Sequence, residues 1–172
     1  MLQLSSVKLI SRLGLASPWC LSSSCHYLEE GDFHRDATDA IAGATPTQRL
    51  YCFERSSGKV AAALHWRPDE EHHRLHAIAL RGGATGPIGG ATTEHVHAAG
   101  IFALGVVQYR ARAVGGSGAM IAGDDVAGGW GADLKALGFT PRAEGWRLAP
   151  AASGSRLSAH AALARIRLTT RR

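Results

Sequence analysis

Three strand-like segments joined by two short turns occupy positions 49–80 and constrain the fold more than any other feature of the 172-residue chain. In the middle segment, Lys59–Arg67, apolar residues recur at every second position, and a period of two predicts a half-buried β-strand. The flanking segments, Arg49–Arg55 and His72–Leu80, are rich in apolar residues, and positions 56–58 have the Ser-Ser-Gly composition of a hairpin turn. We therefore predict an antiparallel meander of three strands.

Helices and strands alternate after the meander. Residues 81–91 are glycine-rich, and Thr92–Val114 carries apolar residues on more than one side, as a largely buried helix does. The remaining segments are predicted as a strand, a helix and a strand, over Ala119–Ala122, Gly131–Leu137 and Ala143–Leu148. The order predicts an α/β fold with a mixed, mostly antiparallel sheet flanked by helices.

Two further helices are predicted ahead of the meander. Apolar residues in Ser5–Leu15 are spaced loosely as on a helix. The second helix, Asp32–Ala42, is expected to turn four residues toward the core: Phe33, Ala37, Ala40 and Ile41.

The positive charge of the chain is concentrated at its end. The formal net charge is +5, but five of the 19 Lys and Arg residues lie in Ser153–Arg172, which has no acid, and the other 14 balance the 14 Asp and Glu residues. A protein that grips nucleic acid needs a cationic surface across its footprint, so no DNA partner is expected. We predict one domain over residues 1–152 and a basic tail over 153–172, which packs on the body, mediates a homodimer or contacts an acidic partner.

Cysteine usage and hydropathy favour a cytoplasmic protein. The three cysteines, Cys20, Cys25 and Cys52, form no Cys-x-x-Cys pair, which fits a reducing compartment. No uncharged apolar run approaches the ~18 residues that a membrane span needs. The first 28 residues contain no acid, a composition shared with organellar transit peptides, so targeting remains an alternative.

A run near the end of the predicted domain carries a family resemblance. Residues 134–139, Leu-Lys-Ala-Leu-Gly-Phe, are followed by Gly145–Leu148, so a short helix ends at Gly138 and Phe139 enters the core before the closing strand. Together with the meander and the glycine-rich segment, this run resembles the GNAT superfamily of acyl-CoA N-acyltransferases over Leu50–Leu148. The resemblance implies an acyl-CoA N-acyltransferase-like fold with acetyl-CoA as co-substrate.

The same resemblance implies that the glycine-rich segment binds the pyrophosphate of the co-substrate. Bare backbone N–H groups at the start of a helix form an anion site, and glycines let phosphates approach. The preferred register places this site at six consecutive residues: Gly86, Pro87, Ile88, Gly89, Gly90 and Ala91. Registers at 81–86 and at 97–102 are alternatives, and so is a hairpin loop that binds nothing.

The resemblance implies main-chain groups for catalysis but does not identify the general base. The resemblance implies that main-chain groups of the third meander strand, at Ile78, Ala79 and Leu80, meet the pantetheine arm and the thioester carbonyl. A neutral amine needs a general base, for which His76 and Glu54 are candidates. His65 is a further candidate, expected on the opposite side of its strand from Trp66, whereas His76 is expected to share a strand face with Ile78 and Leu80.

The general acid of the family is missing from its usual position. Several members have a tyrosine four residues before the glycine of Leu-Gly-Phe, and here that position is Leu134. Tyr109 or solvent is expected to protonate the thiolate instead. No metal is expected, since His95 and His97 lie ~200° apart on a helix and no cysteine or paired carboxylate accompanies the histidines at ligand spacing.

The sequence thus predicts an N-acetyltransferase that transfers an acetyl group from acetyl-CoA to a primary amine of a small molecule or protein. A catalytically impaired GNAT-like binding or regulatory module is the main alternative. A weaker one is a toxin-like acetyltransferase acting on charged tRNA, which only the basic tail favours.

Overall fold

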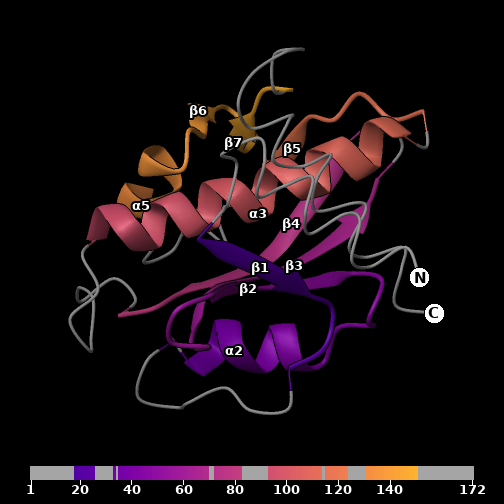
Figure 1. The fold of residues 1–172 in the computed structure, drawn as a ribbon. Coiled ribbons are helices and arrows are strands. Elements are labelled where there is room, and N and C mark those ends of the chain that lie inside the picture. Colours follow the sequence, from indigo (N-terminus) through magenta and orange to yellow (C-terminus); the bar gives the residue numbers. More distant parts are fainter. Residues whose placement is uncertain are drawn as a thin grey trace, which may run out of the picture.

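The computed structural model describes residues 18–25, 33, 35–69, 72–82, 93–113, 115–123 and 131–150, which form one sheet flanked by helices (Figure 1). The strands are β1 (Trp19–Ser22), β2 (Arg49–Glu54), β3 (Val60–Pro68), β4 (His73–Leu80), β5 (Met120–Ala122), β6 (Thr140–Arg142) and β7 (Gly145–Leu148). The helices are α2 (Arg35–Ala42), α3 (Thr93–Ala113) and α5 (Gly131–Ala136). The predicted α/β fold with a mixed, mostly antiparallel sheet is confirmed.

One crossover makes the sheet mixed. The strand order is β1-β2-β3-β4-β5-β7-β6, and β2, β3 and β4 form the predicted antiparallel meander. Among the described strands, only β4 and β5 pair in parallel; the other neighbours are antiparallel. A parallel pair needs a long connection that returns the chain to the starting end of the sheet. Helix α3 provides that return.

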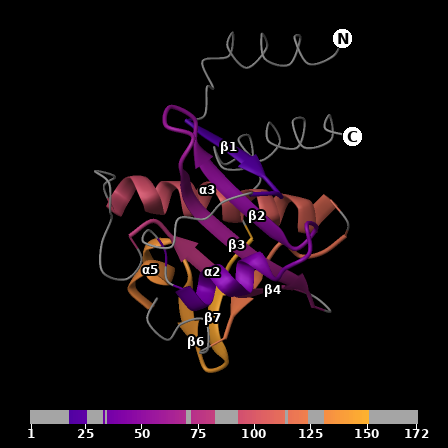
Figure 2. The ribbon, with the colours of Figure 1, turned by 90° about the horizontal axis from the view of Figure 1, so that it is seen from below.

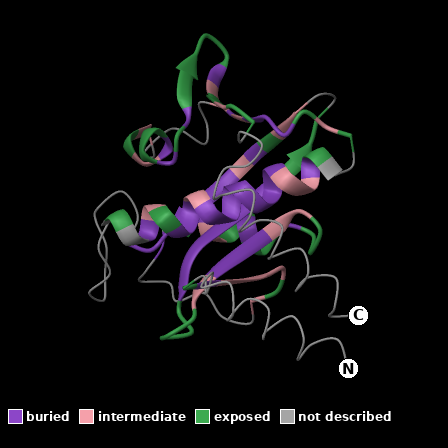
Figure 3. Cartoon of the chain, turned by 45° about the horizontal axis from the view of Figure 1, so that its top comes forward, coloured by how far each residue is buried: buried purple, intermediate pink, exposed green. Residues whose placement is uncertain are grey.

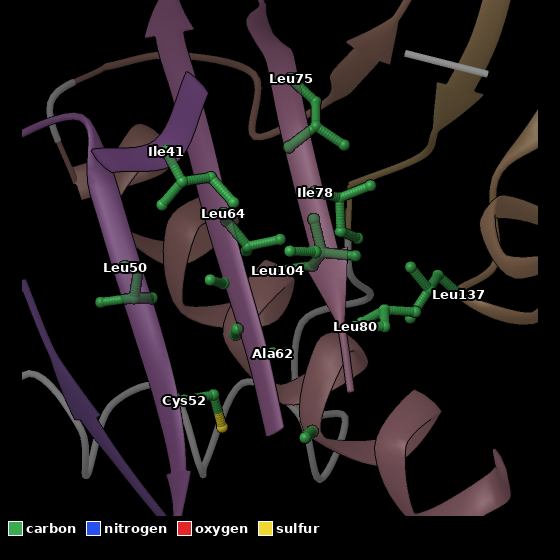
Figure 4. Packing of buried hydrophobic residues seen from close by; sticks show 14 of the residues in the cluster. Ile41, Leu50, Cys52, Ala62, Leu64, Leu75, Ile78, Leu80, Leu104 and Leu137 are labelled. Atoms are coloured by element: carbon green, nitrogen blue, oxygen red, sulfur yellow. The ribbon is translucent and has the colours of Figure 1, made fainter. Parts of the chain in front are cut away.

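Helices α2 and α3 lie on opposite faces of the sheet (Figures 1 and 2). A Cβ added to Gly100 of α3 would lie 3.3 Å from Cδ2 of Leu80, so the helix approaches β4 closely. Leu64 pairs with Ile78, and side chains two apart along a strand share a face, so these residues and Leu80 all face α3. Figure 4 shows their packing together with Leu104.

Alanines line the other face of the two central strands. Ala61 and Ala63 of β3 and Ala77 and Ala79 of β4 are each at most 4% exposed. Such small side chains let α2 lie close to the strands, where Ile41 is fully buried. Strand β3 is therefore buried on both faces from residue 60 to 66, and the prediction of a half-buried strand is wrong. Its alternation separates large from small side chains, not buried from exposed ones.

The sheet has two edge strands that the sequence analysis does not assign. Strands β1 and β6 have four and three residues, too few for a period-two pattern to stand out. Pro141 within β6 suits an edge position, because proline lacks a ladder donor. Ala40 is exposed, so its predicted inward orientation on α2 is wrong, whereas Ala37 and Ile41 are buried as predicted. The predicted helix over residues 5–15 lies outside the described residues.

Gly145, at the turn into β7, is required by its conformation and by its neighbours. Its φ is +109°, a region that side-chain-bearing residues rarely adopt. A Cβ there would also lie 2.5 Å from the carbonyl oxygen of Ala122, which pairs with Trp146. Gly58, in the β2–β3 turn, shares the positive φ but has open space around it.

We expect Gly145→Ala to lower the free energy of unfolding by about 3 kcal/mol and Gly58→Ala by about 1 kcal/mol. Both substitutions impose backbone strain, but only the first forces β5 and β7 apart. Urea denaturation of the two variants measures the difference. Equal losses would show that the close approach of β7 to Ala122 contributes nothing.

Candidate active site

The pairing of β4 with β5 ends well before β4 does. Ladder partners join His73 to Met120, Arg74 to Ile121 and Leu75 to Ala122. Strand β4 continues for five more residues, to Leu80, and within the described part of the chain no strand pairs with them on the β5 side. The sheet is thus continuous at the start of β4 and interrupted at its end.

Main-chain groups of Ile78 and Leu80 are directed toward that interruption. The Arg81 N–H donates to the Ala61 carbonyl of β3 at 3.0 Å. Successive residues of a strand direct their N–H and C=O groups to opposite sides, so those of Ile78 and Leu80 are directed away from β3. The side chains of both residues are at most 2% exposed, so these positions offer a ligand the backbone, not the side chain.

Helix α3 begins at Thr93, directly after the glycine-rich segment. The preferred pyrophosphate register, Gly86–Ala91, lies outside the described residues but ends two positions before this helix. The register at 97–102 is wrong, because those residues are inside α3, where backbone N–H groups bond to the preceding turn. The register at 81–86 begins with an arginine that has structural partners.

That arginine, Arg81, is 7% exposed. Its guanidinium donates to the Val60 carbonyl and lies over the Phe33 ring, 5.7 Å from the ring centroid. It holds the end of β4 to β3 and to the segment ahead of α2. To bind a phosphate, this side chain would have to break its contacts with Val60 and Phe33.

A β-bulge on β4 centres on His76. His65 pairs with Ala77 and Trp66 pairs with Leu75, which leaves His76 as an extra residue opposite the His65–Trp66 step. The rings of His65 and His76 stack with centroids 5.3 Å apart. His76 therefore lies on the α2 face with His65, and the prediction that it shares a face with Ile78 and Leu80 is wrong, because the bulge breaks the alternation.

His65 is buried without a hydrogen bond. It is 5% exposed, and neither ring nitrogen has a hydrogen-bond partner within the described part of the chain. Burial lowers the pKa of His65, and the neighbouring His76 and Arg67 lower it further. The Ala40 carbonyl of α2 has a weaker, opposing effect on that pKa. At neutral pH the pair thus contains one buried, uncharged imidazole beside a half-buried one.

The other two catalytic candidates lie apart from this pair. Glu54 is the last residue of β2, and its carboxylate accepts a hydrogen bond from the Ser57 hydroxyl of the β2–β3 turn at 2.5 Å. Val60 begins β3 directly after that turn, and His65 lies five residues further along the strand. His65 is therefore roughly 16 Å from the turn. Tyr109 is on α3, across the sheet from His76. Of the predicted side chains, the structure brings together only the two histidines.

The Leu-Gly-Phe run packs as the sequence predicts. Gly138 has a φ of +93° and ends α5, while the Phe139 N–H bonds back to the Leu134 carbonyl at 2.9 Å. Leu134 and Phe139 are at most 2% exposed. Leu134, where family members place a tyrosine, is therefore a core residue with no acid to offer.

An arginine-lined cavity near the bulge is not apparent from the sequence. Arg74, Ile121 and Arg147 lie side by side on β4, β5 and β7, as their pairing shows. They line an open cavity of about 570 Å³ together with Asp69, which follows β3, and with residues of the β6–β7 hairpin. Figure 3 shows how exposed that hairpin is. No linear pattern joins Arg74 to Arg147, so only strand pairing reveals the grouping.

The described residues contain neither a cluster of metal ligands nor a membrane-spanning helix. Within them, no three His, Cys, Asp or Glu side chains gather closely enough to hold a metal ion. His97 on α3 instead contacts Asp133 of α5, with 2.7 Å between Nε2 and Oδ1. None of the helices in this part of the chain has the length and hydropathy to cross a bilayer.

No family model, curated protein or solved structure matches this chain.

Replacing the buried imidazole should change the pH dependence of stability. The pKa of His65 is ordinary in the unfolded chain, near 6.5, and lower in the folded protein. The folded state therefore loses stability as pH falls below about 6.5, until the lower pKa is passed. We expect His65→Phe to be about 1 kcal/mol more stable at pH 7.5, since an unbonded buried polar ring is removed.

The melting-temperature advantage of His65→Phe should then grow between pH 7.5 and pH 5. His73, whose pKa burial also lowers, is present in both proteins and cancels in the difference. Melting curves at four pH values measure this. A constant advantage across the range would contradict a lowered pKa for His65.

Proposed function

We propose that this protein is an acyl-CoA-dependent N-acyltransferase of the GNAT type, transferring an acetyl group from acetyl-CoA to a primary amine. The observation that carries the proposal is the early end of the β4–β5 pairing, which leaves the backbone of Ile78 and Leu80 without a strand partner in the described chain. An extended pantetheine arm has amide groups that can complete that edge as a strand would. The start of α3 at Thr93, directly after the glycine-rich segment, supports a phosphate site at the same end.

The proposed reaction uses a main-chain N–H group of β4 and a proton from solvent. The amine nitrogen attacks the thioester carbonyl, and a C–N bond forms as the carbonyl becomes an oxyanion. A main-chain N–H near Ile78 stabilises that oxyanion. The intermediate collapses, the C–S bond breaks, and the thiolate of CoA leaves and takes a proton from solvent.

His76 is the residue we assign as general base. It lies on β4 two positions before Ile78, and the bulge turns its ring toward His65 on the α2 face, where it remains half-buried. The uncharged His65 ring stacked against it fixes its orientation and adds no positive charge. A histidine of near-neutral intrinsic pKa can accept the proton that the attacking amine must lose.

A binding or regulatory module is the second candidate, favoured by the absence of an acid at the family position. Leu134 is fully buried, and Tyr109 is on the far side of the sheet. A cofactor cleft without turnover would fit those two facts. Turnover assays, not binding, separate the candidates.

We also propose that the protein works in the cytosol. Cys20, Cys25 and Cys52 form no disulfide with one another in the described structure. That state fits a reducing compartment.

Calorimetric titration with acetyl-CoA tests the cofactor site. We expect a dissociation constant below 1 mM, as for ordinary enzyme substrates, with free CoA binding in the same range because the phosphates and pantetheine arm are shared. Adenosine, which lacks both, is the control and should give no heat. An absence of heat from acetyl-CoA at submillimolar concentration would contradict the proposal.

Kinetics of His76→Gln test the base. We expect kcat to fall about 100-fold, with the dissociation constant of acetyl-CoA unchanged within twofold, because the base acts only on the amine. Tyr109→Phe is the comparison and should keep kcat within about threefold, since that phenol is across the sheet. Release of the CoA thiol measures both. Loss of activity in Tyr109→Phe with full activity in His76→Gln would reverse the assignment.

A further inference from the structure

We infer that the acceptor amine also carries an anionic group, a carboxylate or a phosphate, which binds the arginines of the cavity beside the bulge. This inference rests on the proposed function, because it places the acceptor next to His76. It goes further by assigning the chemical class of the acceptor.

The arginines gather on the sheet face that also holds His76. Arg67 lies two residues beyond His65 on β3 and pairs directly with Arg74 of β4, so both side chains are on the His65 side of the sheet. The ladder continues from Arg74 through Ile121 to Arg147. Three exposed guanidinium groups thus cross one face, from β3 to β7.

This arrangement does not favour the fold. Like charges directly opposite on neighbouring strands destabilise a sheet, and Arg67 and Arg74 are such a pair. Arg74 contacts Asp69, but at 3.7 Å with both side chains about 45% exposed, and such pairs contribute at most about 1 kcal/mol. Neither Arg147 nor Arg142 forms an ion pair with a described residue. Arg142 and Arg147 can therefore take an anion without breaking an ion pair to a described residue, and Arg74 would give up only its weak contact with Asp69.

The cavity also has room and the right position for a small acceptor. Its volume is about 570 Å³, and it is lined by Arg74, Arg142 and Arg147 and by two carboxylates, Asp69 and Glu144. A guanidinium binds carboxylate or phosphate through two parallel hydrogen bonds. The carboxylates attract the ammonium form of an incoming amine. A ligand with one amine and one anion matches this mixture better than a polyamine, which the arginines repel.

The separation between His76 and Arg74 also fits an acceptor that carries both an amine and an anionic group. His76 is two residues from Arg74 along β4, a separation of roughly 7 Å. An amine held at the bulge is therefore a few bonds from an anion held at the arginines, as in an amino acid or an amino phosphate. Glu144 and Arg142 lie on the β6–β7 hairpin, which closes the outer side of the cavity.

A panel of matched acceptors tests the inference with the full chain. Amino acids are compared with their carboxamides, and phosphoethanolamine with ethanolamine, by release of the CoA thiol. We expect kcat/KM to be at least tenfold higher for the anionic member of a pair, and the two arms distinguish a carboxylate from a phosphate. In Arg74→Gln and Arg147→Gln that ratio should fall at least tenfold. Lys59→Gln removes the same charge at the far end of β3 and should keep the ratio.

Each result decides between the two proposals. If acetyl-CoA binds in the calorimeter but the neutral member of every pair reacts as well as the anionic one, the inference fails and the proposed function stands. If acetyl-CoA does not bind, both fail. Should acetyl-CoA bind with no acceptor turned over, the Nε–Hε signals of Arg74 and Arg147 in nuclear magnetic resonance decide. Shifts caused by the anionic members alone support the inference, and no shift overturns it.

Discussion

Strand β5 lies parallel to β4 only because α3 carries the chain back across the sheet, and the rest of the structure depends on that crossover. The helix buries its apolar side against Leu64, Ile78 and Leu80 and so fixes where β5 begins. The parallel pairing then extends over three residues and stops at Leu75. Among the described strands, the continuation of β4 to Leu80 has no partner on this side, although its side chains are already buried.

Because β3 is buried on both faces, the imidazole of His65 is enclosed in the protein interior. The alanines of β3 and β4 allow α2 to lie close to the sheet, so His65 is almost completely buried and neither ring nitrogen makes a well-formed hydrogen bond among the described residues. An unbonded buried imidazole costs free energy. It is retained beside a bulge, an irregularity that proteins use to redirect a side chain. The bulge turns His76 toward His65, and together they place one half-buried imidazole next to the interrupted edge.

The arginines and the histidines share one face through strand pairing alone. Arg67 and His65 are neighbours on β3, Arg74 and His76 on β4, and Arg147 joins them from β7. Backbone pairing brings these cations together even though like charges repel, because main-chain hydrogen bonds and core burial outweigh a solvent-screened repulsion. The polar surface beside the bulge is therefore held rigidly by the sheet.

The sequence by itself determined the meander, the helix, strand and helix that follow it, and the Leu-Gly-Phe stop, because periodicity, turn residues and a helix-ending glycine are local properties of the chain. It also located Gly86–Ala91 immediately ahead of α3. Tertiary structure alone decided the length of the β4–β5 pairing, the burial of the alanine face and the bulge at His76. These depend on where separate segments meet, and so does the grouping of Arg74 with Arg147. Local patterns specify each strand, whereas the register between strands follows from how their side chains fit once both faces are covered.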